Sequence, residues 1–259
     1  MQTISNRTLR TVVSPIAFVL LMLLLWEAAC RALNVSKFVV PRPSEIVPMF
    51  VLRWDVIWPN AMQTLLTTLS GFAIGVSIGF VLGVALGASP RLYKTIFPTL
   101  IGVNSIPKVA FVPLLVLWAG LGTVPAVITS AIIVIFPVAV VVSASIATMD
   151  PELNDVMRSL GASRIVTLTK IGIPQAMPYF FGSLKIAITL AFIGSILAET
   201  IAANRGLGYM MNRAASDFDV ELVFTGLLSL AAMGILLYLA SIFAERRSVA
   251  WVHRRGDQT

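Results

Sequence analysis

Cysteine and histidine are almost absent from this sequence: each occurs once, as Cys30 and His253. A single cysteine excludes a disulfide within the chain and a cysteine metal cluster. A single histidine argues against a zinc protease or a histidine-dependent hydrolase. A phosphate-binding loop of the form G-x-x-x-x-G-K-[ST] is also missing. We therefore expect that this chain has no catalytic residue and binds neither a metal nor a cofactor.

The sequence is also poor in charge. Only 12% of its 259 residues are charged, 58% are hydrophobic, and the mean hydropathy is +0.91, far from the balance of soluble proteins. Six apolar stretches are long enough to cross about 30 Å of hydrocarbon as helices. They cover approximately residues 15–32, 65–86, 96–118, 124–146, 180–201 and 223–243. We therefore expect an all-α membrane protein with six transmembrane helices.

The segments between these stretches are too short to form a separate soluble domain. We expect one transmembrane domain over residues 1–259, with its core at about 62–246. The stretch 15–32 is interpreted as an additional N-terminal span. Glu27 and Arg31 stand where a removable signal peptide would carry small residues.

The positive residues are distributed unevenly between the two sides of the membrane. The net charge is +7. Most Lys and Arg residues fall in the N-terminal segment, the link after residues 65–86, the segment 150–178 and the C-terminal tail. The positive-inside rule then places both termini on the cytoplasmic side of the membrane. This sorting accounts for the basic charge, and no nucleic-acid partner is expected.

Five glycines recur at a strict spacing of four, at Gly71, Gly75, Gly79, Gly83 and Gly87. Because four residues turn by about 400° on an α-helix, these positions form a slowly winding stripe. Small residues in such a stripe let another helix approach closely. We interpret the stripe as a packing seam and not as a chemical site.

The stretch 96–118 is interrupted by prolines and contains Asn104, Ser105 and Lys108 at membrane depth. Broken membrane helices with polar groups usually line a cavity. A charge at the bilayer centre costs roughly 3 kcal/mol or more on insertion scales. The alternative is that Lys108 lies near an end of the span and reaches the interface. We regard these three residues as candidate translocation residues.

Glu199 lies near the end of the fifth stretch, and the helix is expected to break at Gly206 and Gly208. A structural pairing of Glu199 with Arg205 or Lys108 is favoured over solute binding. Glu199 is kept as a fourth candidate for the translocation pathway.

The segment 150–178 begins with a strong helix start, because Asp150 suits the N-cap and Pro151 the first helical position. Acidic residues here favour capping over metal binding or acid catalysis. Gly161 should end this helix, and a second helix should end before Pro174. Such a pair of short helices suits a groove of another protein, or it packs on the ends of its own spans.

The same segment resembles the cytoplasmic motif of membrane permease subunits of ATP-binding-cassette importers, which reads E-A-A, three residues, G, nine residues, I-x-L-P. Residues 155–157 (Asp-Val-Met) stand at the first three positions, Gly161 follows after three residues, and residues 171–174 (Ile-Gly-Ile-Pro) complete the motif. The spacing matches in full, although Val and Met replace two alanines.

Further segments resemble the nitrate, sulfonate and taurine branch of this family: VVPRPSEIV, IPKVAFVPLLVLWAGLG and LAETIAANRGLGYMM. The resemblance implies the type I importer permease fold, a second permease copy, a cytoplasmic ATPase dimer that binds ATP and Mg, and an external solute-binding protein. It also implies a coupling helix that contacts the ATPase, within a coupling loop at about 150–178. The expected coupling residues are Asp155, Val156, Met157, Leu160, Gly161, Ala162, Ser163, Arg164, Ile165, Leu168 and Pro174.

The branch implies a small anion such as nitrate, a sulfonate or taurine as the solute. Similar permeases serve thiamine precursors, riboflavin or aromatic acids, and this alternative stays open. An ion-coupled secondary transporter would need acids within the membrane, and only Glu27 and Glu199 qualify, both near span ends. A membrane-embedded enzyme would need clustered acids or histidines. Neither alternative accounts for the motif in the segment 150–178.

Overall fold

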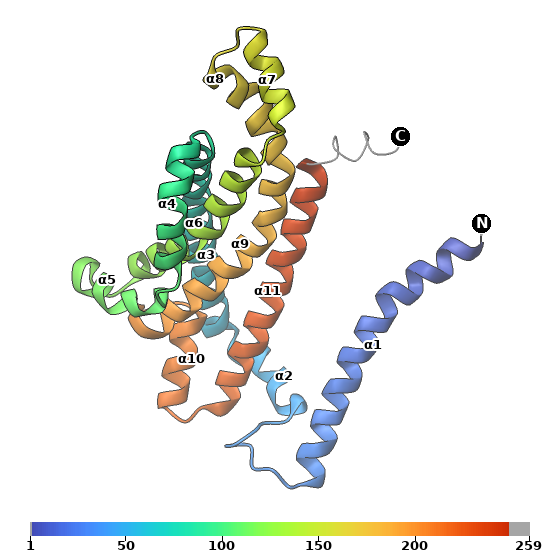
Figure 1. Ribbon diagram of the computed structural model, residues 1–259. Helices are drawn as coiled ribbons and strands as arrows, with labels where there is room; N and C mark the ends of the chain where they lie inside the picture. The colour runs from blue at the N-terminus through green and yellow to red at the C-terminus, as the bar shows by residue number, and fades with distance from the viewer. Residues whose placement is uncertain (1, 249–259) are drawn as a thin grey trace.

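Every regular element in the described part of the chain is a helix, which confirms the expected all-α fold (Figure 1). The computed structural model describes the backbone of residues 2–248 and the side chains of residues 17–245 and 247. The elements are α1 (Gln2–Ala32), α2 (Pro43–Leu52), α3 (Trp54–Gly87), α4 (Pro90–Asn104), η1 (Lys108–Phe111), α5 (Val112–Ala119), α6 (Thr123–Ala147), α7 (Pro151–Ser159), α8 (Arg164–Thr167), η2 (Leu168–Gly172), α9 (Ile173–Ala202), α10 (Leu207–Ser216) and α11 (Val220–Ser248). His253 and the rest of the C-terminal tail lie outside the described residues.

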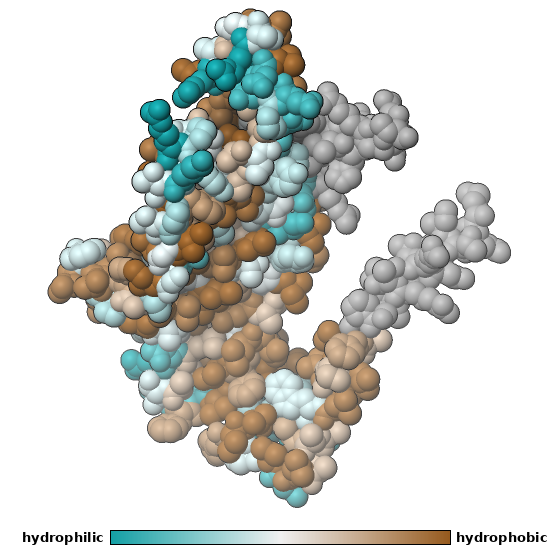
Figure 2. Space-filling model, viewed as in Figure 1, coloured by the Kyte–Doolittle hydropathy of each residue, from teal (hydrophilic) through white to brown (hydrophobic). Residues whose placement is uncertain are grey.

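Among the described residues, four uninterrupted helical segments are long and apolar enough to cross a membrane: Trp54–Gly87, Thr123–Ala147, Arg164–Ala202 and Val220–Glu245. A fifth candidate is the pair Pro90–Asn104 and Lys108–Ala119, which bends by 79°. The first expected span, residues 15–32, lies within α1, but the side chains up to residue 16 are outside the described part. Figure 2 shows hydrophobic residues over the middle of the molecule and hydrophilic ones gathered over α7 and α8.

The centre of the bundle is formed by α3, α6 and α9. All five glycines of the stripe lie on α3 against α6, which confirms the predicted packing seam. Val134, Val138 and Val142 of α6 are buried there together with Ala187 and Ala191 of α9. Small residues on α3 and α9 let branched residues of α6 fill the space between them.

Several expected helix boundaries differ from the structure. The second apolar stretch was expected at about residues 65–86, but α3 already starts at Trp54. Pro59 lies in the second turn of α3, where it removes one backbone hydrogen bond from a helix of 34 residues. The apolar stretch therefore underestimates the length of this helix.

The first helix stands apart from the bundle over most of its length (Figure 1). It is attached near its C-terminal end, where the ring of Trp26 packs on Phe224 with centroids 5.7 Å apart. There the Ser44 hydroxyl also donates to the Glu27 carboxylate at 2.9 Å. This end of α1 is thus joined to α2 and α11.

The bundle has two distinct ends (Figure 1). We call the end that carries α7 and α8 the elbow end and the opposite end, which carries α10, the hairpin end. The candidate coupling residues belong to the first, and Glu199 lies close to the second.

Candidate functional site

The elbow consists of two arms, α7 and the helix that begins with α8, joined by a turn at Gly161. The first arm, α7, is capped at both ends by the expected residues. The Asp150 carboxylate accepts a hydrogen bond from the Glu152 N–H at 2.9 Å. At the other end Gly161 has φ +75°, the left-handed conformation that glycine adopts without strain. The N–H groups of Gly161 and Ala162 donate to the carbonyls of Arg158 and Met157, each at 3.0 Å. These two bonds form a Schellman motif that sets the direction of the turn.

The second arm does not end before Pro174, so this expectation was wrong. Ser163 caps α8, and the helix continues through the π-helical turn η2 into α9. The Ile173 N–H bonds back to Leu168, five residues earlier. Proline lacks an N–H and its ring collides with the carbonyl four residues before it. The wider π turn moves that carbonyl aside, which lets the helix pass Pro174 unbroken.

An apolar surface on the elbow is exposed. We call it the elbow surface and define it as Leu153, Val156, Leu160, Ile165 and Val166. Leu160 and Ile165 are 75% and 73% exposed. Leu160 is the C-cap residue of α7 and Ile165 lies in α8, and these two helices project beyond the bundle (Figure 1). These side chains therefore do not pack on the ends of their own spans, the alternative that the sequence left open.

The other expected coupling residues are distributed over the same structure. Asp155, Gly161, Ser163 and Arg164 are exposed, and Met157 and Ala162 are half-buried on the turn. Two of the expected residues have different surroundings: Leu168 packs against the bundle core, and Pro174 lies in the first turn of α9. Leu153 and Val166 were not among the expected coupling residues. Leu153 lies three residues before Val156 on the same face of α7, whereas nothing in the sequence distinguishes Val166 from an ordinary apolar residue of the second arm.

Asn104, Ser105 and Lys108 lie together where α4 ends. The Lys108 ammonium donates to the Asn104 carbonyl oxygen and, at 2.5 Å, to the Asn104 side-chain oxygen. The Ser105 hydroxyl donates to the Ile101 carbonyl at 3.2 Å. A cation at the C-terminal end of a helix satisfies free carbonyls and complements the helix dipole. Asn104 and Lys108 are half-buried and Ser105 is exposed, so this break presents polar groups on the surface of the bundle.

Glu199 is completely buried, with 0% of its surface exposed. The hydroxyls of Thr64 and Thr67 donate to its two carboxylate oxygens, each at 2.7 Å. The Gly208 N–H donates to the same carboxylate at 3.3 Å. These are its side-chain partners in the described chain, in place of Arg205 or Lys108, which the sequence suggested. Sequence reasoning missed the two threonines, although their spacing of three places both on one face of α3.

The two glycines after Glu199 let α10 begin directly against it. A Cβ added to Gly206 would overlap the Glu199 carboxylate, and one added to Gly208 would lie 2.6 Å from the Ile196 carbonyl oxygen. Gly206 also has φ +116°. The expected helix break lies at residues 203–206, between α9 and α10, and thus includes Gly206, whereas Gly208 lies inside α10. The two glycines permit the close approach of α10 to α9.

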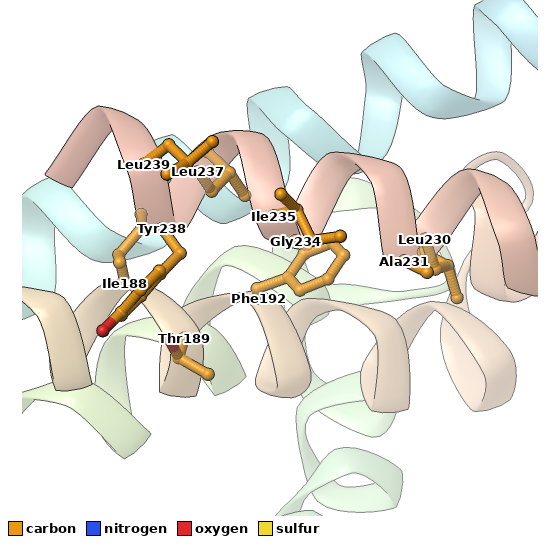
Figure 3. A pocket seen from close by; sticks show the side chains of 10 residues that line it. All are labelled: Ile188, Thr189, Phe192, Leu230, Ala231, Gly234, Ile235, Leu237, Tyr238 and Leu239. Atoms are coloured by element: carbon orange, nitrogen blue, oxygen red, sulfur yellow. The ribbon is translucent and has the colours of Figure 1, made fainter. Parts of the chain in front are cut away.

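An apolar groove of about 680 Å³ lies between α9 and α11 (Figure 3). It is lined by Ile188, Thr189 and Phe192 of α9 and by residues between 230 and 239 of α11. A Cβ on Gly234 would lie 3.1 Å from the Phe192 ring. Such a lining suits lipid chains or another helix better than a hydrated solute, so we leave the groove out of the candidate site. The described residues also contain no group of three or more His, Cys, Asp or Glu side chains that could hold a metal.

Comparisons with known proteins show a family match and several similar permeases. Residues 75–255 match the family described as the binding-protein-dependent transport system inner membrane component. The chain is 32% identical to the riboflavin transport system permease protein RibX of Chloroflexus aurantiacus, over 90% of this chain and 87% of the relative. It is 26% identical to the formylaminopyrimidine transport permease protein ThiX of Halalkalibacterium halodurans, over 92% of this chain and 95% of that one. It is 25% identical to the taurine transport system permease protein TauC of Escherichia coli, over 93% and 90% of the two chains.

The fold also matches a solved structure of the methionine ABC transporter MetNI in an inward-facing conformation. The TM-score is 0.57 at 19% identity, and the match covers 78% of this chain and 98% of that one. This likeness supports the type I importer permease fold. The family implies an ATPase and a solute-binding protein as partners. The chain belongs to the family of binding-protein-dependent transport system inner membrane components and is a membrane permease subunit of an ABC transporter, not an enzyme.

Proposed function

We propose that this chain and a second copy of it form the translocation pathway of a bacterial importer, and that the elbow binds the cytoplasmic ATPase. The exposed elbow surface carries this proposal. Exposed apolar side chains in a contiguous patch usually mark an interaction site. Here they stand on a turn whose direction is set by Gly161 and the Schellman bonds, so the patch is held in one orientation.

The elbow surface suits a groove in a partner protein. Two short helices present apolar residues, and the charged side chains of Asp155 and Arg164 are exposed on the same two arms. A groove that accepts such a helix pair would bury its apolar side chains and leave the charges at the rim. ATP and Mg would bind to the ATPase, and closure of the ATPase dimer would move the elbow.

The positive-inside rule supports a cytoplasmic elbow end. The segment 150–178 and the start of α4 are rich in Lys and Arg, and both lie at this end of the bundle (Figure 1). Both chain termini would then be cytoplasmic, in the inner membrane. The hairpin end would face the external solute-binding protein.

The residues at the break between α4 and α5 are proposed to line the translocation pathway. Asn104, Ser105 and Lys108 place polar groups at a bend of 79° in an otherwise apolar region. Helix breaks at membrane depth are typical of sites that contact a solute. The full burial of Glu199 supports a positioning role for that residue.

The proposed solute is a small anion such as nitrate, a sulfonate or taurine, and Lys108 supports this choice because its charge would attract an anion. A second candidate, riboflavin or a thiamine precursor, is favoured by the 32% identity to RibX and the 26% identity to ThiX. Relatives named for different solutes thus match this chain at similar identity. Uptake of labelled taurine, nitrate and riboflavin by vesicles that contain the whole importer decides between the two classes.

The elbow is tested by the double substitution L160E/I165E in an affinity-tagged chain purified from membranes. Both side chains are exposed, so the fold should be kept, but two carboxylates would have to enter the apolar groove of the ATPase. We expect at least tenfold less co-purified ATPase and a matching loss of ATP-driven uptake. The control is L33E, since Leu33 is 75% exposed and follows α1 at the other end of the molecule.

Retention of the ATPase by L160E/I165E would contradict the proposed contact. Uptake that needs a proton or sodium gradient and no ATP would instead support a secondary transporter. Formation of a lipid product would support a membrane enzyme.

A further inference from the structure

One helix connects the elbow with Glu199. The segment Arg164–Ala202 runs without a break through α8, η2 and α9 for 39 residues, a length of about 58 Å at 1.5 Å per residue. The elbow turn lies at its start, and Glu199 lies three residues before its end. A displacement of the elbow is therefore a displacement of the helix that holds Glu199.

At the hairpin end, Glu199 joins this helix to two others. Thr64 and Thr67 on α3 donate to its carboxylate, and the Gly208 N–H at the start of α10 donates to it as well. The Leu207 N–H donates to the Thr64 hydroxyl at 2.8 Å. We call the group Thr64, Thr67, Glu199, Leu207 and Gly208 the hairpin clasp. In the clasp, the first two N–H groups of α10 depend on one carboxylate and one hydroxyl for their partners.

A second observation, independent of these bonds, shows that the contact is close. Gly206 leaves no space for a Cβ next to the Glu199 carboxylate, and Gly208 leaves none next to α9. Asn60 of α3 accepts a further hydrogen bond from the Gly206 N–H at 2.8 Å. The backbone at the start of α10 therefore contacts the backbone of α9 and the Asn60 and Thr64 side chains of α3.

Separating the start of α10 from α3 and α9 should cost free energy. A fully buried carboxylate is stable only while donors surround it, and separating α10 from α3 and α9 would leave both the carboxylate and the backbone N–H groups without partners. Buried polar groups in one connected network also strengthen one another. Small displacements should therefore move the three helix ends together and not apart.

We propose that Glu199 is a positioning residue for transport: it makes the adjoining ends of α3, α9 and α10 one rigid unit, so that a displacement of the elbow is transmitted to the hairpin end. This inference rests on the proposed function, since the ATPase would cause that displacement. It assigns to Glu199 the transfer of movement and no contact with solute. The matched pair Thr64 and Thr68 makes the inference testable, because the Thr68 hydroxyl bonds only to Ser195 of α9, at 2.6 Å, and does not reach α10.

The experiment measures the distance between nitroxide labels on α3 and α10 by electron spin resonance. Met62→Cys and Ala215→Cys provide two exposed label positions, and Cys30→Ala removes the single native cysteine. The complex with the co-purified ATPase is studied without nucleotide and with ADP and vanadate. The variants are E199Q, whose amide cannot accept from all three donors, T64V, which removes the link to α10, and the control T68V.

We expect one narrow distance distribution in the parent and in T68V, the same in both nucleotide states. In E199Q and T64V the distribution should become at least twice as broad and should change when vanadate is added. A residue with a merely structural role would lower the yield of folded protein without making the distance depend on nucleotide.

Narrow and unchanged distributions in both E199Q and T64V would overturn the proposal, as would equal broadening in T68V. Should E199Q not fold, T64V gives the same test. Failure of the proposed function itself is seen separately, because the parent complex would then contain no ATPase. The distributions without nucleotide would still show whether Glu199 holds α10 in place.

Discussion

Gly79 on α3 lies so close to Val138 on α6 that a Cβ on the glycine would be 2.9 Å from the Cβ of the valine. The same Cβ would be 2.7 Å from the Ile135 carbonyl oxygen. The other four glycines of the stripe meet α6 in the same way, at Ser130, Val134, Val142 and Ile146. The seam is thus a continuous contact between two membrane helices, and any added atom must push them apart.

The seam predicts that Gly79→Ala destabilises the protein. The added methyl group would collide with backbone and not with a flexible side chain, and overpacking of this kind costs about 1–3 kcal/mol. Thermal unfolding of the purified protein in detergent should show a midpoint lower by several degrees. The control is Gly102→Ala on α4, where a Cβ meets nothing within 4 Å. If the unfolding midpoint falls equally in both variants, the prediction that the contact between α3 and α6 leaves no space at Gly79 is wrong.

The turn of the elbow predicts a specific effect of Gly161→Val. A β-branched residue at φ +75° is strained by about 1–3 kcal/mol, and relief of the strain would redirect the second arm. We expect a modest loss of stability and at least tenfold less co-purified ATPase. Gly120→Val, at φ +76° and ψ 177° between α5 and α6, introduces strain that is at least as large in an equally open turn. It should lower stability at least as much and keep the ATPase. Gly161→Asn should behave like the parent, because asparagine tolerates this conformation.

The break at α4 predicts that Lys108→Met lowers uptake of an anionic solute at least tenfold, because the substitution removes the positive charge beside Asn104. The amount of bound ATPase should not change. Lys94→Met removes a charge from an exposed position near the start of the same helix and is the matched control. Uptake of labelled taurine or nitrate by vesicles measures both. Full uptake by Lys108→Met would remove Lys108 from the pathway.

The ion pair between Lys185 of α9 and Glu245 of α11 predicts a charge-reversal effect. The ammonium and carboxylate are 2.8 Å apart, and their side chains are 31% and 25% exposed. Lys185→Glu places two carboxylates together and should cost about 1–2 kcal/mol of stability. The double variant Lys185→Glu/Glu245→Lys should recover most of the lost unfolding midpoint. If the double variant is as unstable as the single one, the pair contributes little to the attachment of α11.

Much of the fold could be predicted from local patterns. Apolar stretches of about twenty residues identify membrane helices by length and composition alone. Asp150 and Gly161 mark the two ends of α7 because capping depends on the residue itself and on its immediate neighbours. The glycine stripe indicates a seam since its spacing places all five residues on one face of one helix.

Other features depend on residues that are far apart in the chain. The helix that contacts the stripe could be any of the other spans, and the structure selects α6. The course of the chain past Pro174 depends on the π turn η2, which a proline in the sequence does not reveal. The size of the bend between α4 and α5, 79°, is also set by tertiary packing.

The sequence by itself determined the class of this protein, its helices and the motif of its elbow, because hydropathy, capping and spacing act within one segment. The tertiary structure alone decided the hydrogen-bond partners of Glu199. In the sequence, Glu199 is a carboxylate with possible cationic partners at Arg205 and Lys108. In the folded chain it receives hydrogen bonds from threonines 135 and 132 positions away. A buried carboxyl group takes whichever donors the packing brings to it, and that packing depends on the whole bundle.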